Sequence, residues 1–221
     1  MERKPEPELM DDAAQAAAYA QADFEQPHTM FMEHLAGCLG ETDPVGRALD
    51  LGCGTGDITA RFALRYPEIR VDALDGAARM LEHARARLRR EGIEDRINLL
   101  HRHLPDSTLE SGVYSVAFSN SLLHHLADPL VLWCTVRSAA ASGAFVFIMD
   151  LMRPDSESAA EALVAEYAGG EPEILRRDFL HSLLAAYRVE EVRAQLSAVG
   201  LDTFVVESVS DRHLVVRGRL P

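Results

Sequence analysis

The chain has 221 residues, enough for one domain with a large core, and its 48% hydrophobic and 26% charged residues are typical of a globular protein. Acidic residues outnumber basic ones by 35 to 22, and the net charge of −13 disfavours binding to nucleic acid or to an anionic membrane. Three scattered cysteines argue against a disulfide framework, and neither an apolar span of ~20 residues nor a signal peptide is recognisable, so we expect a cytoplasmic protein.

The predicted elements alternate between helices and strands within a single domain, residues 1–221. Residues 13–40 are expected to form an N-terminal helical segment, and residues 43–151 a core of buried parallel strands joined by amphipathic helices. The predicted strands of this core span 45–51, 70–75, 96–101, 114–119 and 143–150, and its helices span 57–65, 77–90 and 129–140. Residues 189–221 are expected to add a helix over 189–199 and a hairpin of 203–208 with 213–217. The pattern predicts an α/β fold with a mostly parallel sheet.

Residues 152–188 interrupt this alternation, because a crossover between parallel strands needs only about a dozen residues. Two runs at helical spacing, separated by Gly169 and Gly170, indicate a helical insertion. Ligands of open α/β sheets bind beyond the carboxyl ends of the strands, so an insertion that leaves the strand 143–150 is expected to lie over the site. We interpret it as a substrate lid, with a packing elaboration or a dimer contact as the alternative.

A glycine-rich segment, Ala-Leu-Asp-Leu-Gly-Cys-Gly-Thr-Gly at residues 48–56, links a buried strand to a helix. Its glycines can adopt conformations and permit close ligand approach that a Cβ would obstruct; they are Gly52, Gly54 and Gly56. The carboxylate of Asp50, expected at the mouth of the loop, would repel a pyrophosphate but attract the ammonium and sulfonium of S-adenosylmethionine. A dinucleotide fingerprint would have a glycine where Asp57 stands. Cys53 is interpreted as a neutral filler, because Asp50 would raise the pKa of its thiol.

A second anchor, Asp75, ends the predicted strand 70–75 about 20 residues after the glycine loop, where a carboxylate commonly binds a ribose diol. With the glycine loop and the later segment 118–126, Phe-Ser-Asn-Ser-Leu-Leu-His-His-Leu, it makes the chain resemble the class I S-adenosylmethionine-dependent methyltransferases. The resemblance is best over residues 43–150. It implies a Rossmann-like, doubly wound sheet of seven strands closed by an antiparallel hairpin, S-adenosylmethionine as cofactor, and methyl transfer to a small molecule.

The resemblance also implies further site residues, with some departures from the family pattern. Gly76 replaces the usual serine after Asp75, and Met80 is either an apolar wall for adenine or a core residue. His103 and Leu104 occupy the place where an aspartate often binds the adenine amino group. Asn120, at the tip of its strand, is expected to orient the methionine moiety or the substrate. The N-terminal helical segment is expected to close the substrate side with Tyr19, Phe24 and His28.

The chemistry requires few side chains, because a sulfonium methyl group is already activated and alignment of a nucleophile at about 3 Å supplies most of the rate. His124 and His125 follow the strand 114–119 and are predicted to accept a proton or to fix the acceptor atom; a structural histidine pair is the alternative. No metal is expected, since neither a carboxylate nor a third histidine lies at ligand spacing nearby in the sequence.

Two other functions stay open at this stage. A protein or RNA substrate would be favoured if the arginines of the helix 77–90 formed one surface with the mouth of the site; they are Arg79, Arg85, Arg87, Arg89 and Arg90. A solvated helix face is the simpler interpretation of these arginines. A domain that binds the cofactor, or nothing, and acts as a scaffold is the other alternative. The sequence does not fix the oligomeric state, and a homodimer is one option.

Overall fold

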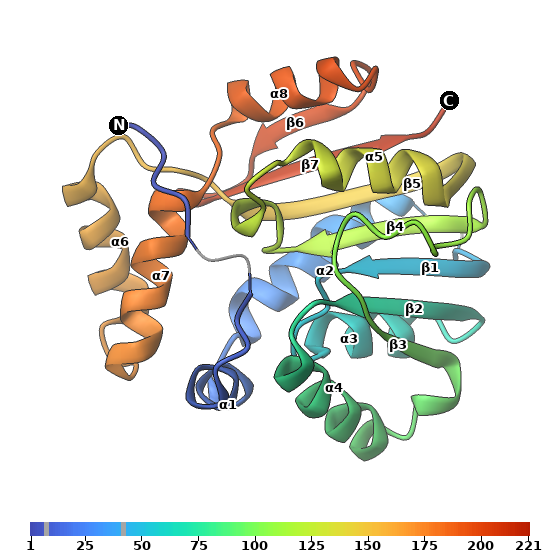
Figure 1. Cartoon of the computed structure of the whole chain (residues 1–221), viewed down its shortest axis with the longest axis horizontal. Helices are drawn as coiled ribbons and strands as arrows, with labels where there is room; N and C mark the ends of the chain where they lie inside the picture. Colours follow the sequence, from blue (N-terminus) through green and yellow to red (C-terminus); the bar gives the residue numbers. More distant parts are fainter. Residues whose placement is uncertain (7–8, 41–42) are drawn as a thin grey trace.

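The computed structural model describes residues 1–6, 9–40 and 43–221. Its centre is a seven-stranded sheet in the order β3-β2-β1-β4-β5-β7-β6 (Figure 1). The strands are β1 (Gly46–Leu51), β2 (Ile69–Asp75), β3 (Ile97–His101), β4 (Tyr114–Asn120), β5 (Ala140–Leu151), β6 (Val205–Ser208) and β7 (His213–Arg219). The first five strands are parallel, whereas β7 runs antiparallel to both β5 and β6. This topology confirms the predicted Rossmann-like fold with its closing hairpin.

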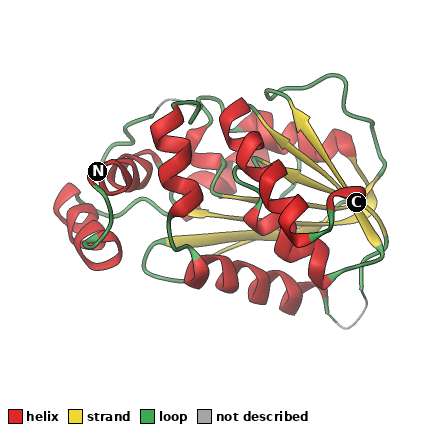
Figure 2. Ribbon diagram, turned by 90° about the horizontal axis from the view of Figure 1, so that it is seen from below, coloured by secondary structure: helices red, strands yellow, loops and turns green. Residues whose placement is uncertain are grey.

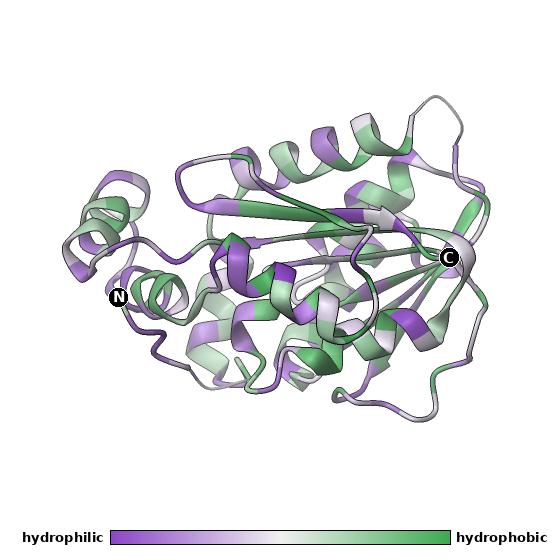
Figure 3. Cartoon of the chain, turned by 90° about the horizontal axis from the view of Figure 1, so that it is seen from above, coloured by the Kyte–Doolittle hydropathy of each residue, from purple (hydrophilic) through white to green (hydrophobic). Residues whose placement is uncertain are grey.

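Helices cover both faces of the sheet (Figure 2). One face carries α2 (Glu25–Leu39), α3 (Asp57–Arg65) and α4 (Ala78–Glu91), and the other carries α5 (Leu130–Ala139) and α8 (Val189–Ala198). Figure 3 shows the strands as mainly hydrophobic, whereas the helices alternate between hydrophobic and hydrophilic residues. A sheet buried on both faces explains why its strands appear in the sequence as continuous apolar runs.

The alternation of side chains along β1 divides the core in two. Ala48 packs with the helices α2, α3 and α4, while its neighbours Leu49 and Leu51 pack with α5 and α8. On the first face, the rings of Phe62 and Phe118 lie 4.5 Å apart, and each such buried aromatic ring stabilises the fold by roughly 1.5 to 3 kcal/mol. The glycine loop that follows β1 therefore leaves a strand that is fixed on both faces.

The predicted N-terminal helical segment consists of two helices with a break between them. The first, α1 (Ala13–Gln21), ends at Ala22, and α2 begins at Glu25 in a new direction. The side chain of Asp23 accepts a hydrogen bond from the backbone N–H of Glu25 at 2.9 Å, a local bond that competes with a continuous helix. The break lets α2 lie on the sheet while α1 reaches the carboxyl ends of the strands.

The insertion after β5 forms the helices α6 (Glu157–Ala168) and α7 (Glu173–Ala185), which pack against each other. Figure 1 shows this pair beyond the carboxyl end of the sheet, with α1 nearby and the first residues of the chain alongside. Gln15 of α1 donates a hydrogen bond to Asp178 of α7 at 2.7 Å, which joins the two segments. Among the described residues, no helix is long and apolar enough to cross a membrane.

Candidate active site

A cavity of about 1040 Å³ opens where the carboxyl ends of β1, β2 and β4 meet the helices α1, α2, α6 and α7. Ligand pockets typically measure a few hundred to about 1000 Å³, so this cavity has room for a nucleoside cofactor together with a small second molecule. We call the part lined by the glycine loop and Asp75 the cofactor half. The part lined by His124, His125 and α6–α7 is called the acceptor half.

The glycine loop is held by the end of the neighbouring strand. The backbone N–H groups of Gly52 and Cys53 both donate to the carbonyl oxygen of Leu74, at 2.8 and 3.0 Å. Gly52 has a φ of +75°, and a Cβ there would approach the side chain of Leu122 to 2.9 Å. Both the conformation and the lack of space therefore require glycine at this position.

Asp50 lies near the end of β1 and lines the cavity, but its side chain is buried. It is 1% exposed, and one of its carboxylate oxygens accepts a hydrogen bond from the Thr59 hydroxyl at 2.6 Å. Burial raises the pKa of Asp50 to about 7, although the Thr59 hydrogen bond opposes this rise. Burial, with Asp50 second, also raises the pKa of the Cys53 thiol well above its usual value, which leaves Cys53 neutral.

Asp75 ends β2 and accepts two backbone hydrogen bonds, from the N–H groups of Gly54 and Ala77, each at 2.8 Å. Each carboxylate oxygen has more than one lone pair. After these two backbone hydrogen bonds, Asp75 can therefore still accept hydrogen bonds from a ligand in the cavity, which it lines. The next residue, Gly76, lies under Leu9 and His103, and a Cβ there would come within 2.7 and 3.0 Å of them. Both are side-chain atoms, so a Cβ at this position would require Leu9 and His103 to shift.

The other residues predicted to bind the cofactor also line the cavity; they are Gly54, Met80, His103, Leu104 and Asn120. Met80 is only 4% exposed and packs in a small cluster with Ala16 and Ala77, so it belongs to the core while it borders the cavity. Gly56 is different, because it is the N-cap of α3 with a φ of +76°. A Cβ there would approach Ala84 to 3.0 Å, which indicates a packing role for this glycine.

Tyr19, Phe24 and His28 line the cavity as a row of rings, with centroids 5.5 Å apart for the first two and 5.4 Å for the last two. His28 Nδ1 lies 3.0 Å from a carboxylate oxygen of Asp57, the first residue of α3. Burial alone would raise the pKa of Asp57, but His28 and two arginines hold it well below its usual value. His28 is therefore fixed beside the glycine loop, on the cofactor side of this row.

His124 is 2% exposed and forms a buried pair with Asp150 near the end of β5, with 2.5 Å between His124 Nδ1 and Asp150 Oδ1. The other carboxylate oxygen of Asp150 accepts a hydrogen bond from the Leu123 N–H at 2.7 Å. Burial would lower the pKa of His124, but the Asp150 carboxylate raises it overall. The sequence analysis missed Asp150, although an acidic residue near the end of an apolar strand is a signal that could have singled it out.

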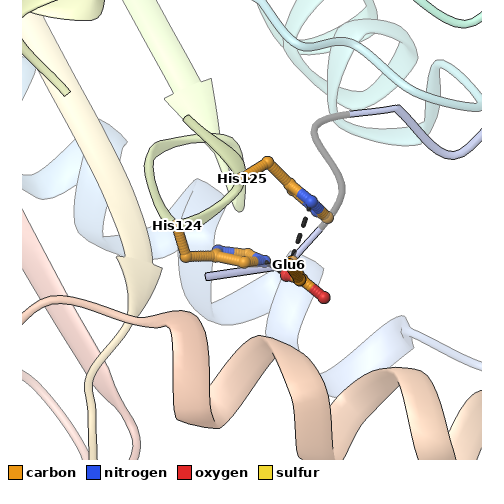
Figure 4. Close-up of side chains that lie close together, drawn as sticks. All are labelled: Glu6, His124 and His125. Carbon is orange, nitrogen blue, oxygen red and sulfur yellow. Dashed lines mark ion pairs between the residues drawn. The ribbon is translucent and has the colours of Figure 1, made fainter. Parts of the chain in front are cut away.

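Glu6, from the first residues of the chain, lies between the two histidines (Figure 4). Its Oε1 atom is 3.4 Å from His124 Nε2 and 3.4 Å from His125 Nδ1. The prediction that no metal binds here considered only residues nearby in the sequence. The fold brings Glu6 to the histidine pair across 118 or more positions.

Arg3 fixes the position of this N-terminal segment. Its guanidinium donates to the carbonyl oxygens of His124 and Ala185, at 2.8 and 2.5 Å, and lies 4.2 Å from the ring centroid of Tyr187. Burial raises the pKa of Glu6, although His124 and Ser182 oppose this rise. The first residues of the chain thus pack against the two histidines that line the acceptor half, a contact that was not predicted from the sequence.

The rest of the acceptor half is lined by the insertion and by the start of β7, including Tyr167, Phe179, Ser182, Arg212 and His213. The Arg212 guanidinium lies 3.3 Å from the ring centroid of Tyr167 and donates to Asp211 at 2.8 Å. Burial, with Arg212 second, lowers the pKa of His213 to about 4, so His213 is neutral at physiological pH. The cavity wall here combines apolar surface with a small number of fixed polar groups.

Comparison with known proteins agrees with this geometry. Residues 48–143 match the family described as "Methyltransferase domain". The chain is 32% identical over 111 residues to a trans-aconitate 2-methyltransferase of Methylobacterium radiotolerans, covering 49% of this chain and 38% of that protein. It is also 37% identical over 76 residues to ribosomal RNA small subunit methyltransferase C of Ectopseudomonas mendocina. This match covers 34% of this chain and 22% of that protein. The chain thus spans well under half the length of these two curated relatives.

A solved structure has the same fold over the whole chain. It is a putative S-adenosylmethionine-dependent methyltransferase of Methanococcus maripaludis, with a TM-score of 0.75, 16% identity, and coverage of 99% of this chain and 98% of that one. Fold, glycine loop and sequence similarity agree on one class. Residues 48–143 are similar to a methyltransferase domain, and the whole chain has the fold of a putative S-adenosylmethionine-dependent methyltransferase.

Proposed function

We propose that this protein transfers the methyl group of S-adenosylmethionine to a small molecule bound in the acceptor half of the cavity. The observation that carries the proposal is that the glycine loop, Asp75 and His124, which pairs with the buried Asp150, border one cavity. The trans-aconitate 2-methyltransferases among its relatives, from several bacteria, support a small acceptor.

The residues of the cofactor half bind and orient. The remaining lone pairs of Asp75 would accept hydrogen bonds from the ribose diol, and the glycine loop would hold the nucleoside and the methionine moiety. Asp50, buried near the end of β1, becomes ionised when a cationic group occupies the cavity, because the cation offsets the cost of burying its charge. Asn120, Gly76, Met80, His103 and Leu104 complete this wall in our proposal.

The residues of the acceptor half position the nucleophile. When bound, the cofactor would supply an activated methyl group to the acceptor, and its sulfur would keep the electrons of the broken carbon–sulfur bond. His124 and His125 fix the acceptor atom or take its proton, and Asp150 holds the ring of His124 in place. The helices α6 and α7, with Tyr19 and Phe24 opposite, exclude water as a substrate lid.

A protein or RNA acceptor is the nearest alternative, and the arginines of α4 bear on it. Arg87 is engaged within the protein, with Nη1 2.7 Å from Asp57 and Nε 3.3 Å from the carbonyl oxygen of Thr55. Among the described residues that line the cavity, the arginines are Arg102 and Arg212, and neither belongs to α4. Three further arginines of α4 face acidic neighbours, Arg79 with Glu82, Arg89 with Glu94 and Arg90 with Glu91, which supports their interpretation as a solvated helix face.

Calorimetry followed by a transfer assay tests the proposal. The purified chain should bind S-adenosylmethionine and S-adenosylhomocysteine but not NAD. Labelled methyl groups should then pass to a member of a panel of small carboxylic acids, phenols and amines, and not to ribosomal RNA or ribosomal protein. Preferential labelling of a macromolecule would support the alternative substrate class. Cofactor binding without transfer to either group of acceptors would support a scaffold role.

A further inference from the structure

We propose that Glu6, His124 and His125 form a binding site for a divalent metal ion of the zinc type. One ligand atom from each residue, a carboxylate oxygen and two imidazole nitrogens, lies within 4.8 Å of the others (Figure 4). Two histidines and a glutamate are a donor set that zinc uses in catalytic sites with three protein ligands. The three residues come from the N-terminal segment and from the turn after β4, η2 (Leu123–His125).

The distances fit a shared metal ion better than direct hydrogen bonds. Glu6 Oε1 lies 3.4 Å from both His124 Nε2 and His125 Nδ1, beyond the usual range of about 2.7 to 3.2 Å for N–H···O hydrogen bonds. Zinc binds nitrogen and oxygen at ~2.1 Å, and in a tetrahedral site two such ligand atoms lie about 3.4 Å apart. These two separations are those of neighbouring ligands around one ion, and the two imidazole nitrogens lie within 4.8 Å of each other.

The hydrogen bonds around His124 orient its ring for metal binding. Asp150 Oδ1 accepts from His124 Nδ1, which leaves Nε2 of the same ring as the atom that faces Glu6. Histidines that bind zinc commonly donate their other ring N–H to a carboxylate in this way. Asp150 is itself fixed by the backbone N–H groups of Leu123 and Leu151, each at 2.7 Å. The ring of His124 cannot turn away without the loss of this network.

Glu6 gives the second, independent observation. Its side chain is only 9% exposed, and among the described residues its Oε1 atom is a buried oxygen without a hydrogen-bond partner. A buried carboxylate oxygen that lacks a hydrogen bond costs free energy, and a bound cation between it and the two imidazoles would remove that cost.

Three protein ligands leave a fourth position on a tetrahedral ion. His124 and His125 both line the cavity, so this position would be open to an acceptor bound in the acceptor half. A metal ion there would bind a hydroxyl or carboxyl oxygen of the acceptor and lower the pKa of a hydroxyl. The site would also join the N-terminal segment to the body of the protein. Metal binding can be measured without a methyl acceptor, so the inference is testable apart from the proposed function.

The experiment uses the full chain, freed of metal with a chelator and titrated with Zn²⁺ by calorimetry and with Co²⁺ by visible absorption. We expect one equivalent of each metal to bind, and Co²⁺ to give the intense absorption of a tetrahedral site. Glu6→Gln and His125→Ala should each weaken Zn²⁺ binding by at least tenfold. The matched controls Glu2→Gln, an exposed glutamate of the same segment, and His181→Ala, an exposed histidine of α7, should bind as the wild type does.

Binding of S-adenosylhomocysteine to each variant serves as the folding check, because the cofactor half lies on other elements. If folded Glu6→Gln and His125→Ala variants bind Zn²⁺ as tightly as the controls, the ion binds elsewhere and the inference is overturned. It is overturned equally if the wild type binds no metal. The cluster is then a protonated His124 held between the carboxylates of Asp150 and Glu6.

Discussion

The two halves of the cavity are built in different ways. In the cofactor half, most polar contacts are made by backbone groups of loops that directly follow β1 and β2, such as the N–H of Gly54 bound to Asp75. In the acceptor half, side chains from distant parts of the chain converge, with Glu6, His124 and Asp150 as the central group. The comparison suggests that the first half serves a cofactor common to the family, whereas the second half adapts to one acceptor.

The largest effect is expected in the acceptor half. His124→Ala should lower turnover by roughly 10²-fold or more, because the group that fixes the acceptor or takes its proton is removed. Asp150→Asn should also lower turnover, since the ring of His124 loses its charged partner. The affinity for S-adenosylhomocysteine, measured by calorimetry, should stay unchanged in both variants. Full activity of both across pH 5 to 9 would make the histidine pair structural and leave catalysis to proximity alone.

The next largest effect is expected in the cofactor half. Asp75→Ala removes charge-assisted hydrogen bonds to the ribose, worth roughly 1.5 to 3 kcal/mol each, so cofactor affinity should fall by tenfold or more. Asp95→Ala, an exposed aspartate in η1 (Glu94–Arg96), is the control and should bind the cofactor normally. Equal affinities of the two variants would mean that the ribose lies elsewhere.

Asp50 should make cofactor binding depend on pH. The pKa of Asp50 in the free protein, about 7, lies above the usual value for an aspartate. The protonated carboxyl group therefore contributes to the stability of the fold, and this contribution to stability is lost as the pH rises through 7. A cationic cofactor favours the ionised form instead. The affinity for S-adenosylmethionine should therefore weaken below pH 7, by up to about tenfold per pH unit. Calorimetry at pH 6, 7 and 8 measures the slope, which Asp50→Asn should abolish.

The smallest effect is expected in the proposed lid. Phe179→Ala removes an aromatic side chain that lines the acceptor half, so the Michaelis constant for the acceptor should rise severalfold while cofactor affinity stays the same. Leu180→Ala, next to it on α7 and packed in the α6–α7 cluster, is the matched control. A loss of cofactor affinity in Phe179→Ala would show that the insertion supports the core, against its interpretation as a lid.

The difference between the cofactor half and the acceptor half also explains which features could be predicted from the sequence. The glycine loop and Asp75 are local features, since strand, turn and carboxylate lie within 30 residues and their chemistry follows from spacing. Most strand boundaries followed from apolar runs for the same reason. Glu6 and Asp150 have no local signal that connects them to His124, because only the tertiary fold brings them together. The break between α1 and α2 was missed because Asp23 competes with the helix through a single side-chain bond.

The most direct test of the central claim, that the two halves act on one reaction, is a crystal structure with an analogue of S-adenosylmethionine that carries an amine in place of the methyl-sulfonium group. We predict that its ribose lies at Asp75 and that the amine points into the acceptor half, toward His124 and His125. An amine that points away from the histidine pair, toward solvent or another part of the surface, would contradict the account.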